Sequence, residues 1–201
     1  KYGRAEQAEK VLAKIVASGG GGQDWLGLGV AQAAQQKWDK AESTLKGAQN
    51  LAPDSPQPSL QLARVYAAKG DTALEKQMTE RAISIEPGSV EAWAYLFGRE
   101  RERSGDDAAE QVVTELANAE TNKRSAAPFI AIQGVYATKD ETRDKGFVWA
   151  QRAVERDPND VFALISLSAL HGQRGDFKAI VELLSPHDAK MSRDVRLAHN
   201  Y

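Results

Sequence analysis

The chain has 201 residues, of which 42% are hydrophobic and 27% charged, a composition typical of a folded protein. Its formal net charge of -2 gives no bulk attraction to nucleic acid or to an anionic membrane surface. The absence of cysteine excludes disulfides, thiolate metal sites and cysteine catalysis, but it does not separate a periplasmic from a cytoplasmic location.

The first expected element is a helix over residues 3–17, whose apolar residues recur at helical spacing. These residues are Ala8, Val11, Leu12, Ile15 and Val16. A run of four glycines, residues 19–22, then ends the helix. Neither Lys-Ser nor Lys-Thr follows this run, so it indicates a flexible connection and not a phosphate-binding loop.

Residues 24–53 form two amphipathic helical runs separated by a turn at residues 35–37. Gly29 and Ala41 are small, which favours a close approach of the two antiparallel helices, and Pro53 cannot extend the helix before it. The positions that define this pattern are Trp25, Leu28, Gly29, Trp38, Ala41, Leu45, Ala48 and Pro53.

The pattern recurs, since Pro53 and Pro87 are 34 residues apart. Both the order of residues and this period resemble the tetratricopeptide repeat (TPR) family. The resemblance implies an all-α fold, a right-handed superhelix of antiparallel helical hairpins. Because the chain lacks an initial Met and begins in the middle of a repeat, we expect it to be a fragment of a longer TPR protein.

We therefore expect a single array over residues 1–201, in which each repeat contacts only its neighbours. Hairpin turns are predicted near Gln36, Gly70, Gly105, Lys139 and Gly175. The array begins with a partial repeat, residues 1–21. Five repeats follow, over residues 22–55, 56–89, 90–124 (irregular), 125–160 and 161–190. A further repeat begins in residues 191–201, which include Leu197 and Tyr201.

Two repeats depart from the pattern. In the second, Ser59 replaces the usual Trp and Glu75 replaces the close-packed Ala, which predicts a shifted or rotated second helix. In the third, Gly98 and Gly105 each come one residue late. Its polar end, residues 118–124, has no proline, and any hinge or division of the array is expected there.

No catalytic, cofactor or metal site is predicted. The three histidines lie on or near different repeats, without metal-ligand spacing. An acidic turn near Asp140 lacks the final Glu of a calcium loop. The arginines around Arg101 alternate with glutamates, which favours a solvated helix over an RNA-binding surface. The most apolar stretch, residues 161–170, is about half a bilayer span, so this segment is not expected to insert into a membrane.

In peptide-binding TPR proteins the inner face of the superhelix is made by the first helix of each repeat. A carboxylate clamp, with Lys and Asn at two of these places, is absent from the first repeat, where Leu26 and Val30 occupy them. The groove is therefore expected to be small and apolar, unless neighbouring repeats cover part of it. Carried over by position, the candidate partner-binding residues are Gln23, Leu26, Val30, Gln57, Leu60, Arg64 and Arg101, with Gly98 and Glu102 beside the last.

The resemblance implies a non-catalytic scaffold or adaptor that binds a protein or peptide partner and no nucleic acid. The sequence is also similar to bacterial TPR proteins that assist envelope assembly, such as the assembly of pilus or exopolysaccharide export systems. The alternative is a regulatory or substrate-recruiting arm of a larger enzyme, for example a glycosyltransferase. The apolar residues at both ends further suggest self-association through the cut ends.

Overall fold

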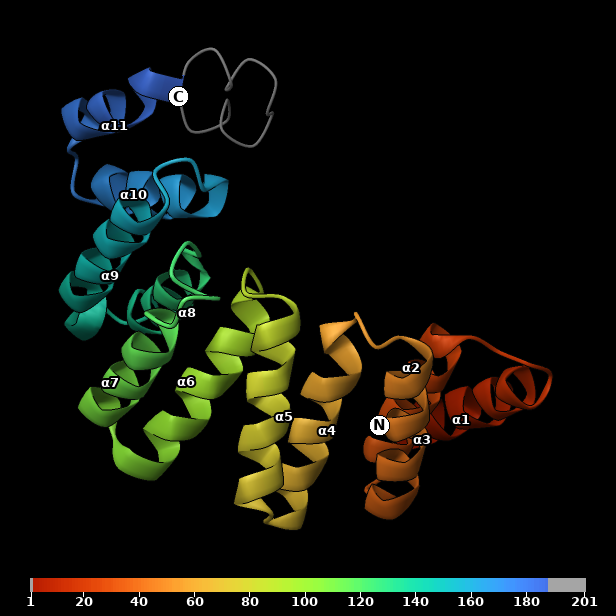
Figure 1. The fold of residues 1–201 in the computed structure, drawn as a ribbon. Coiled ribbons are helices and arrows are strands. Elements are labelled where there is room, and N and C mark those ends of the chain that lie inside the picture. Colours follow the sequence, from red (N-terminus) through yellow and green to blue (C-terminus); the bar gives the residue numbers. More distant parts are fainter. Residues whose placement is uncertain (1, 188–201) are drawn as a thin grey trace. The chain divides into compact units, whose positions relative to one another are not determined.

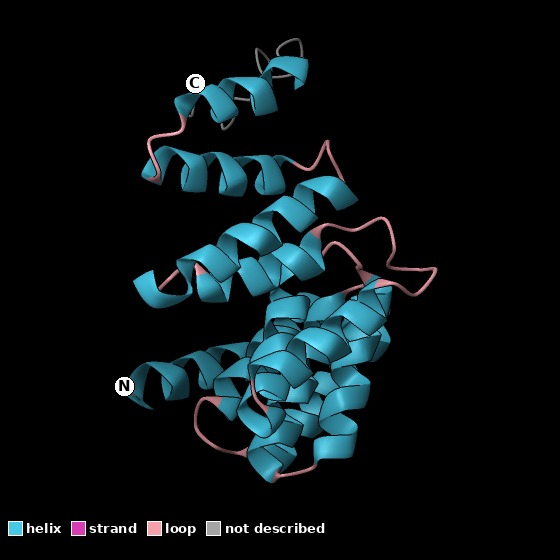
Figure 2. Ribbon diagram, turned by 90° about the vertical axis from the view of Figure 1, so that its left-hand side faces the viewer, coloured by secondary structure: helices cyan, strands magenta, loops and turns pink. Residues whose placement is uncertain are grey.

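The computed structural model describes residues 2–187, and within that range it contains helices and turns but no strand (Figure 2). The helices are α1 (Tyr2–Ala17), α2 (Gly22–Ala33), α3 (Trp38–Leu51), α4 (Pro56–Lys69), α5 (Thr72–Ile85), α6 (Val90–Ser104), α7 (Asp106–Ala117), α8 (Ala127–Tyr136), α9 (Arg143–Arg156), α10 (Val161–Gln173) and α11 (Phe177–Leu184), with the 3-10 turns η1 (Asp140–Thr142) and η2 (Ser185–His187). The predicted residues Leu197 and Tyr201 lie outside the described range.

Consecutive helices pair into five hairpins, α2 with α3, α4 with α5, α6 with α7, α8 with α9 and α10 with α11 (Figure 1). Helix α1 packs on α2, and α3, α7 and α9 each pack on the first helix of the following hairpin. Helices α2 to α11 each contribute buried residues to this stack, whereas Val11 and Ile15 of α1 are 59 and 41% exposed. The predicted all-α solenoid is confirmed.

The first hairpin shows how small residues bring two helices together. A Cβ atom added at Gly29 of α2 would lie 2.6 Å from the Leu45 side chain of α3. Similarly, a Cβ at Gly47 would lie 2.5 Å from the Trp25 ring. Ala41 faces the same interface and is fully buried. Larger side chains at these positions would separate the helices.

In the second hairpin, the expectation of a shifted or rotated α5 is wrong. Glu75 occupies the alanine position and is itself buried, with 2% of its surface exposed. Thr79 and Ala82 are buried with it, at the spacing of Ala41, Leu45 and Ala48 in α3. The register is kept because the interior accommodates the Glu75 side chain. Ser59, at the tryptophan position, is also buried and accepts a hydrogen bond from Gln49 Nε2 at 2.9 Å.

The chain divides into two compact units between Glu86 and Pro87, and not at residues 118–124 as expected. Arg156 holds this polar segment in place within the second unit. Its guanidinium donates to the carbonyl oxygens of Ala117 and Lys123 at 3.1 and 3.0 Å, and to Asn118 Oδ1 at 2.7 Å. An irregular sequence is therefore held by long-range hydrogen bonds.

Candidate functional site

A surface hollow of about 330 Å³ lies in the second unit, on the first helices of two consecutive hairpins. Gly98, Arg101 and Glu102 of α6 line it together with Val135 of α8. Helices α6 and α8 pack against each other, and a Cβ at Gly98 would meet nothing within 4 Å. The space therefore arises where α6 lacks a side chain. We call it the α6–α8 hollow.

Arg101 supplies a fixed cation at this hollow. Its Nε donates to Asp106 Oδ1 at 2.5 Å, and its guanidinium carbon lies 6.0 Å from the centre of the Tyr136 ring. The hydrogen bond with Arg101 holds the pKa of Asp106 below its usual range. The Arg101 side chain remains 37% exposed. Because a guanidinium has five N–H donors, it keeps several for a bound carbonyl or carboxylate group.

A polar cluster at the junction of α7, α8 and α9 supports the wall of the hollow. The buried Tyr136 donates its hydroxyl hydrogen to Glu110 Oε1 at 2.5 Å. Lys145 Nζ lies 2.6 Å from the same carboxylate oxygen and 4.7 Å from the centre of the tyrosine ring. Burial, followed by the hydrogen bond with Glu110, raises the pKa of Tyr136. These contacts fix α8 beside α7 and so fix Val135.

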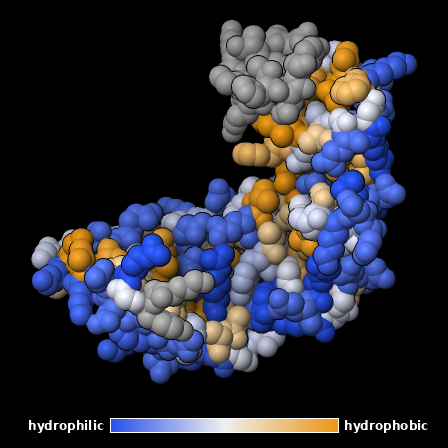
Figure 3. All heavy atoms as spheres, turned by 180° about the vertical axis from the view of Figure 1, so that it is seen from behind, coloured by the Kyte–Doolittle hydropathy of each residue, from blue (hydrophilic) through white to orange (hydrophobic). Residues whose placement is uncertain are grey.

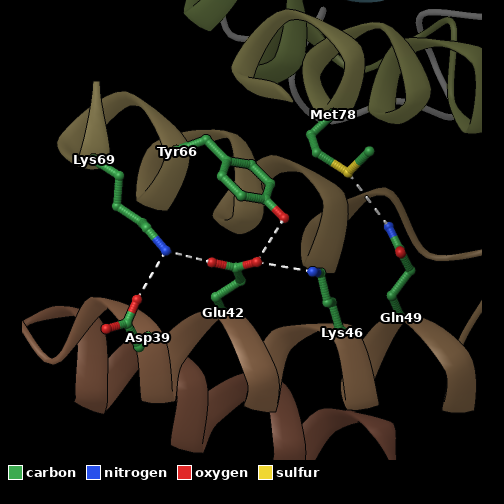
Figure 4. Close-up of polar contacts among 7 residues, drawn as sticks. All are labelled: Asp39, Glu42, Lys46, Gln49, Tyr66, Lys69 and Met78. Carbon is green, nitrogen blue, oxygen red and sulfur yellow. Dashed lines mark hydrogen bonds and ion pairs between the residues drawn. The ribbon is translucent and has the colours of Figure 1, made fainter. Parts of the chain in front are cut away.

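The first unit has a matching cluster between α3 and α4 (Figure 4). Tyr66 donates to Glu42 Oε1 at 3.1 Å, and the ammonium groups of Lys46 and Lys69 lie 2.8 and 2.7 Å from the Glu42 carboxylate. Lys69 also pairs with Asp39 at 2.8 Å. These hydrogen bonds, led by that from Lys46, lower the pKa of Glu42 from 4.5 to about 2. Both clusters join one hairpin to the next.

The predicted binding residues of the first unit have different surroundings. Gln23 and Arg64 are exposed and Gln57 is half-buried. Val30 is 41% exposed, among the more exposed of the large apolar side chains.

Leu60 is 1% exposed, so its prediction as a groove residue is wrong. It belongs to the packed interior, and a partner could not contact it without opening the repeat. Leu26 is half-buried and packs against the cluster of Ala41, Leu45, Leu62, Val65 and Tyr66. Neighbouring helices thus cover part of the predicted face in the first unit.

Among the predicted binding residues, Arg101 lines the α6–α8 hollow, and the neighbouring Gly98 and Glu102 were placed on the same face. Val135 lies in the fourth repeat and is not among the predicted residues. The sequence feature that could identify Val135 as a groove residue is its position directly before Tyr136, which occupies the same repeat position as Tyr66.

No group of metal-ligating side chains suited to an ion occurs among residues 2–187. In the acidic turn, Asp140 pairs with Arg143 and Asp144 pairs with Arg174. His171 packs edge-on against Phe147, with ring centres 4.9 Å apart. None of the described helices combines the length and the apolar character needed to cross a membrane.

Apolar side chains also gather on the surface of the C-terminal helices (Figure 3). The large ones exposed in that region are Phe162, Phe177 and Val181, at 56, 69 and 51%. The rest of the face in this view is mostly hydrophilic.

Comparison with protein-family models gives no match, and comparison with curated proteins gives none either. Solved structures do match. Yeast Tom70 is 17% identical, with a TM-score of 0.53 over 96% of this chain and 41% of that chain. A chain of the Cut9–Hcn1 hetero-tetramer of APC/C is 11% identical, with a TM-score of 0.50 over 92% of this chain and 36% of that one.

A third match is the C-terminal part of a TPR repeat-containing protein from Cytophaga hutchinsonii. It is 14% identical, with a TM-score of 0.50, and covers 94% of this chain and 77% of the other. The present chain spans well under half of the Tom70 and Cut9–Hcn1 chains that it matches. At these identities, the three likenesses bear on the fold.

Proposed function

Because the chain has the fold of the tetratricopeptide-repeat proteins, we propose that it is a non-catalytic scaffold that binds a segment of a partner protein at the α6–α8 hollow. The observation that carries the proposal is the convergence of Gly98, Arg101 and Glu102 with Val135 around one surface space. These residues come from the first helices of two hairpins, the face that the family resemblance assigns to peptide binding.

The chemistry of the hollow favours an extended or helical peptide with a small apolar anchor. Val135 and the bare backbone at Gly98 accept an apolar side chain, while Arg101 and Glu102 offer a donor group and an acceptor group beside it. A contact of this size supplies modest affinity once the cost of ordering the peptide is subtracted. We expect micromolar binding, on the order of -8 kcal/mol.

The test is to fill the hollow without disturbing the fold. Gly98→Leu adds a side chain where a Cβ meets nothing within 4 Å, so the helix tolerates it. Gly3→Leu, in α1, makes the same change in equally open space and is the matched control. We expect a partner captured by the wild type and by Gly3→Leu to be lost with Gly98→Leu. Equal capture by all three folded proteins would move the binding site elsewhere.

Glutamate substitution at Leu60 is not a usable test of binding, because a carboxylate at this buried position would unfold the repeat. We further propose that the scaffold acts in bacterial envelope assembly, and this more specific role is supported by the family resemblance alone. Identification of the captured partner separates it from the alternative of an arm that recruits substrate to an enzyme.

A further inference from the structure

A second, larger hollow, of about 640 Å³, lies in the first unit where the first hairpin turns. Five consecutive residues of the turn and the beginning of α3 line it, together with Lys69 from the end of α4. The lining residues are Gln36, Lys37, Trp38, Asp39, Lys40 and Lys69. We call this space the turn hollow.

The turn has an unusual residue for its backbone conformation. Gln36 has a φ of 60°, in the left-handed region that favours glycine. The equivalent turns use Gly70 and Gly175, with φ of 77° and 73°. All three turns make the same pair of backbone hydrogen bonds. In the first turn, Gln36 N donates to Ala33 O at 2.8 Å and Lys37 N donates to Gln32 O at 3.0 Å.

The next residue departs from its equivalents as well. Asp71 and Asp176 follow the two turn glycines, and each caps the next helix. The Asp71 side chain accepts a hydrogen bond from the backbone N–H of Leu74, and the Asp176 side chain accepts one from that of Ala179. Lys37 occupies this place in the first turn and makes no such bond. The first turn therefore lacks both residues that stabilise its equivalents, and both replacements line the hollow. Local rules broken together at one place are typical of functional positions.

The lysines of the hollow differ in how far they are neutralised. Lys37 Nζ pairs with Glu9 at 2.6 Å, and Lys69 pairs with Asp39 and Glu42 (Figure 4). Lys40 is exposed and makes no ion pair with any residue in the range 2–187. Lys37 and Lys69 are thus neutralised by Glu9, Asp39 and Glu42, and within residues 2–187 Lys40 is the cation of the lining that is left to pair with a ligand.

Trp38 adds an apolar wall beside these cations. Its side chain is half-buried, with one part packed against the cluster around Leu45 and the remainder lining the hollow. Tryptophan is enriched among the residues that carry most of the binding energy in protein interfaces. The wall suits an aliphatic side chain, and the ammonium group of Lys40 suits a neighbouring carboxylate.

We propose that the turn hollow binds an acidic segment of a protein partner. An aliphatic side chain of the segment packs on Trp38, a carboxylate pairs with Lys40 Nζ, and the amide of Gln36 hydrogen-bonds the segment's backbone. This site lies on the turn of the first hairpin, and it is independent of the function proposed for the α6–α8 hollow.

The probe is a short fluorescein-labelled peptide in which glutamate alternates with leucine, together with the same peptide carrying glutamine for glutamate. Binding is followed by fluorescence anisotropy at low salt. We expect saturable binding of the glutamate peptide only, weakened about tenfold by Lys40→Glu. Lys139→Glu, which makes the same charge change at an exposed lysine of the second unit, should leave the Kd unchanged.

Gln36→Gly separates binding from folding. Relief of the left-handed backbone should raise the melting temperature by about 3 °C, while loss of one neutral hydrogen bond weakens the glutamate peptide about threefold. The proposal is overturned if the wild type does not bind the peptide, if the glutamine peptide binds equally, or if Lys139→Glu matches Lys40→Glu. Binding of an RNA oligonucleotide or an anionic vesicle that depends on Lys40, without peptide binding, would also overturn it.

Discussion

Gly29 and Gly98 show how the same residue serves opposite purposes in this chain. Gly29 permits contact, since a Cβ there would lie 2.6 Å from the Leu45 side chain. Gly98 leaves space, since a Cβ there would meet nothing within 4 Å. The first glycine supports the packing of a hairpin and the second forms a hollow. The family pattern identifies both positions but does not tell these two roles apart.

The two glycines should therefore respond oppositely to alanine. We predict that Gly29→Ala destabilises the protein by about 1 to 3 kcal/mol, because the methyl group overpacks the hairpin. Gly98→Ala should stabilise it by about 0.5 to 1 kcal/mol, because alanine loses less backbone entropy in a helix. Urea denaturation of both variants measures the difference. A loss of stability in Gly98→Ala would mean that α6 has no free space there.

At the level of helices, consecutive hairpins are joined by polar clusters as well as by apolar packing. Glu42 on α3 accepts a hydrogen bond from Tyr66 on α4, and Glu110 on α7 accepts one from Tyr136 on α8. Each glutamate follows a fully buried alanine, Ala41 or Ala109. The cluster therefore lies at the edge of the close-packed interface and fixes the position of one hairpin on the next.

The cluster in the first unit should make stability depend on pH. The folded state lowers the pKa of Glu42 from 4.5 to about 2, so its contribution is present above about pH 4.5 and is lost as the pH falls toward 2. We predict that Glu42→Gln costs about 2 kcal/mol at pH 7 and flattens the loss of stability across that acid window. Denaturation midpoints between pH 7 and pH 2 test this. A variant with the exposed Glu141→Gln should follow the wild-type curve.

The sequence was sufficient to predict what depends on local pattern. Gly70, Gly105 and Gly175 mark their turns because each follows a helical run and precedes Asp. What depends on distant neighbours was not predictable. Glu75 breaks the pattern locally, yet it is buried in register. Leu60 occupies a groove position, yet adjacent helices cover it.

The same limit applies to the sites. Tyr66 and Glu42 are 24 residues apart, so no local spacing signals their hydrogen bond. Lys69 likewise reaches the turn hollow from the far end of the second hairpin's first helix. Arg101 was predicted from its repeat position alone, and it lines the α6–α8 hollow.

For the whole molecule, the repeat architecture means that stability is a sum of local terms and contacts between neighbouring repeats. The first unit, residues 1–86, has its own packed cluster around Ala41, Leu45, Leu62, Val65 and Tyr66. In the second unit, separate clusters form around Leu164 and Leu184, and around Ala150, Leu167 and Leu170. A local defect should therefore have a local effect.

Ala41→Trp tests this expectation. Ala41 is fully buried between helices, so the indole should destabilise the first hairpin by about 1 to 3 kcal/mol through overpacking. Native-state hydrogen exchange should then show faster exchange in α2 to α5, with an effect that fades along the chain and is smallest in α10. The exposed Lys40→Ala is the control and should leave exchange unchanged. Equal acceleration from α2 to α10 would instead mean that the array opens as one cooperative body, since only global unfolding exposes distant repeats together.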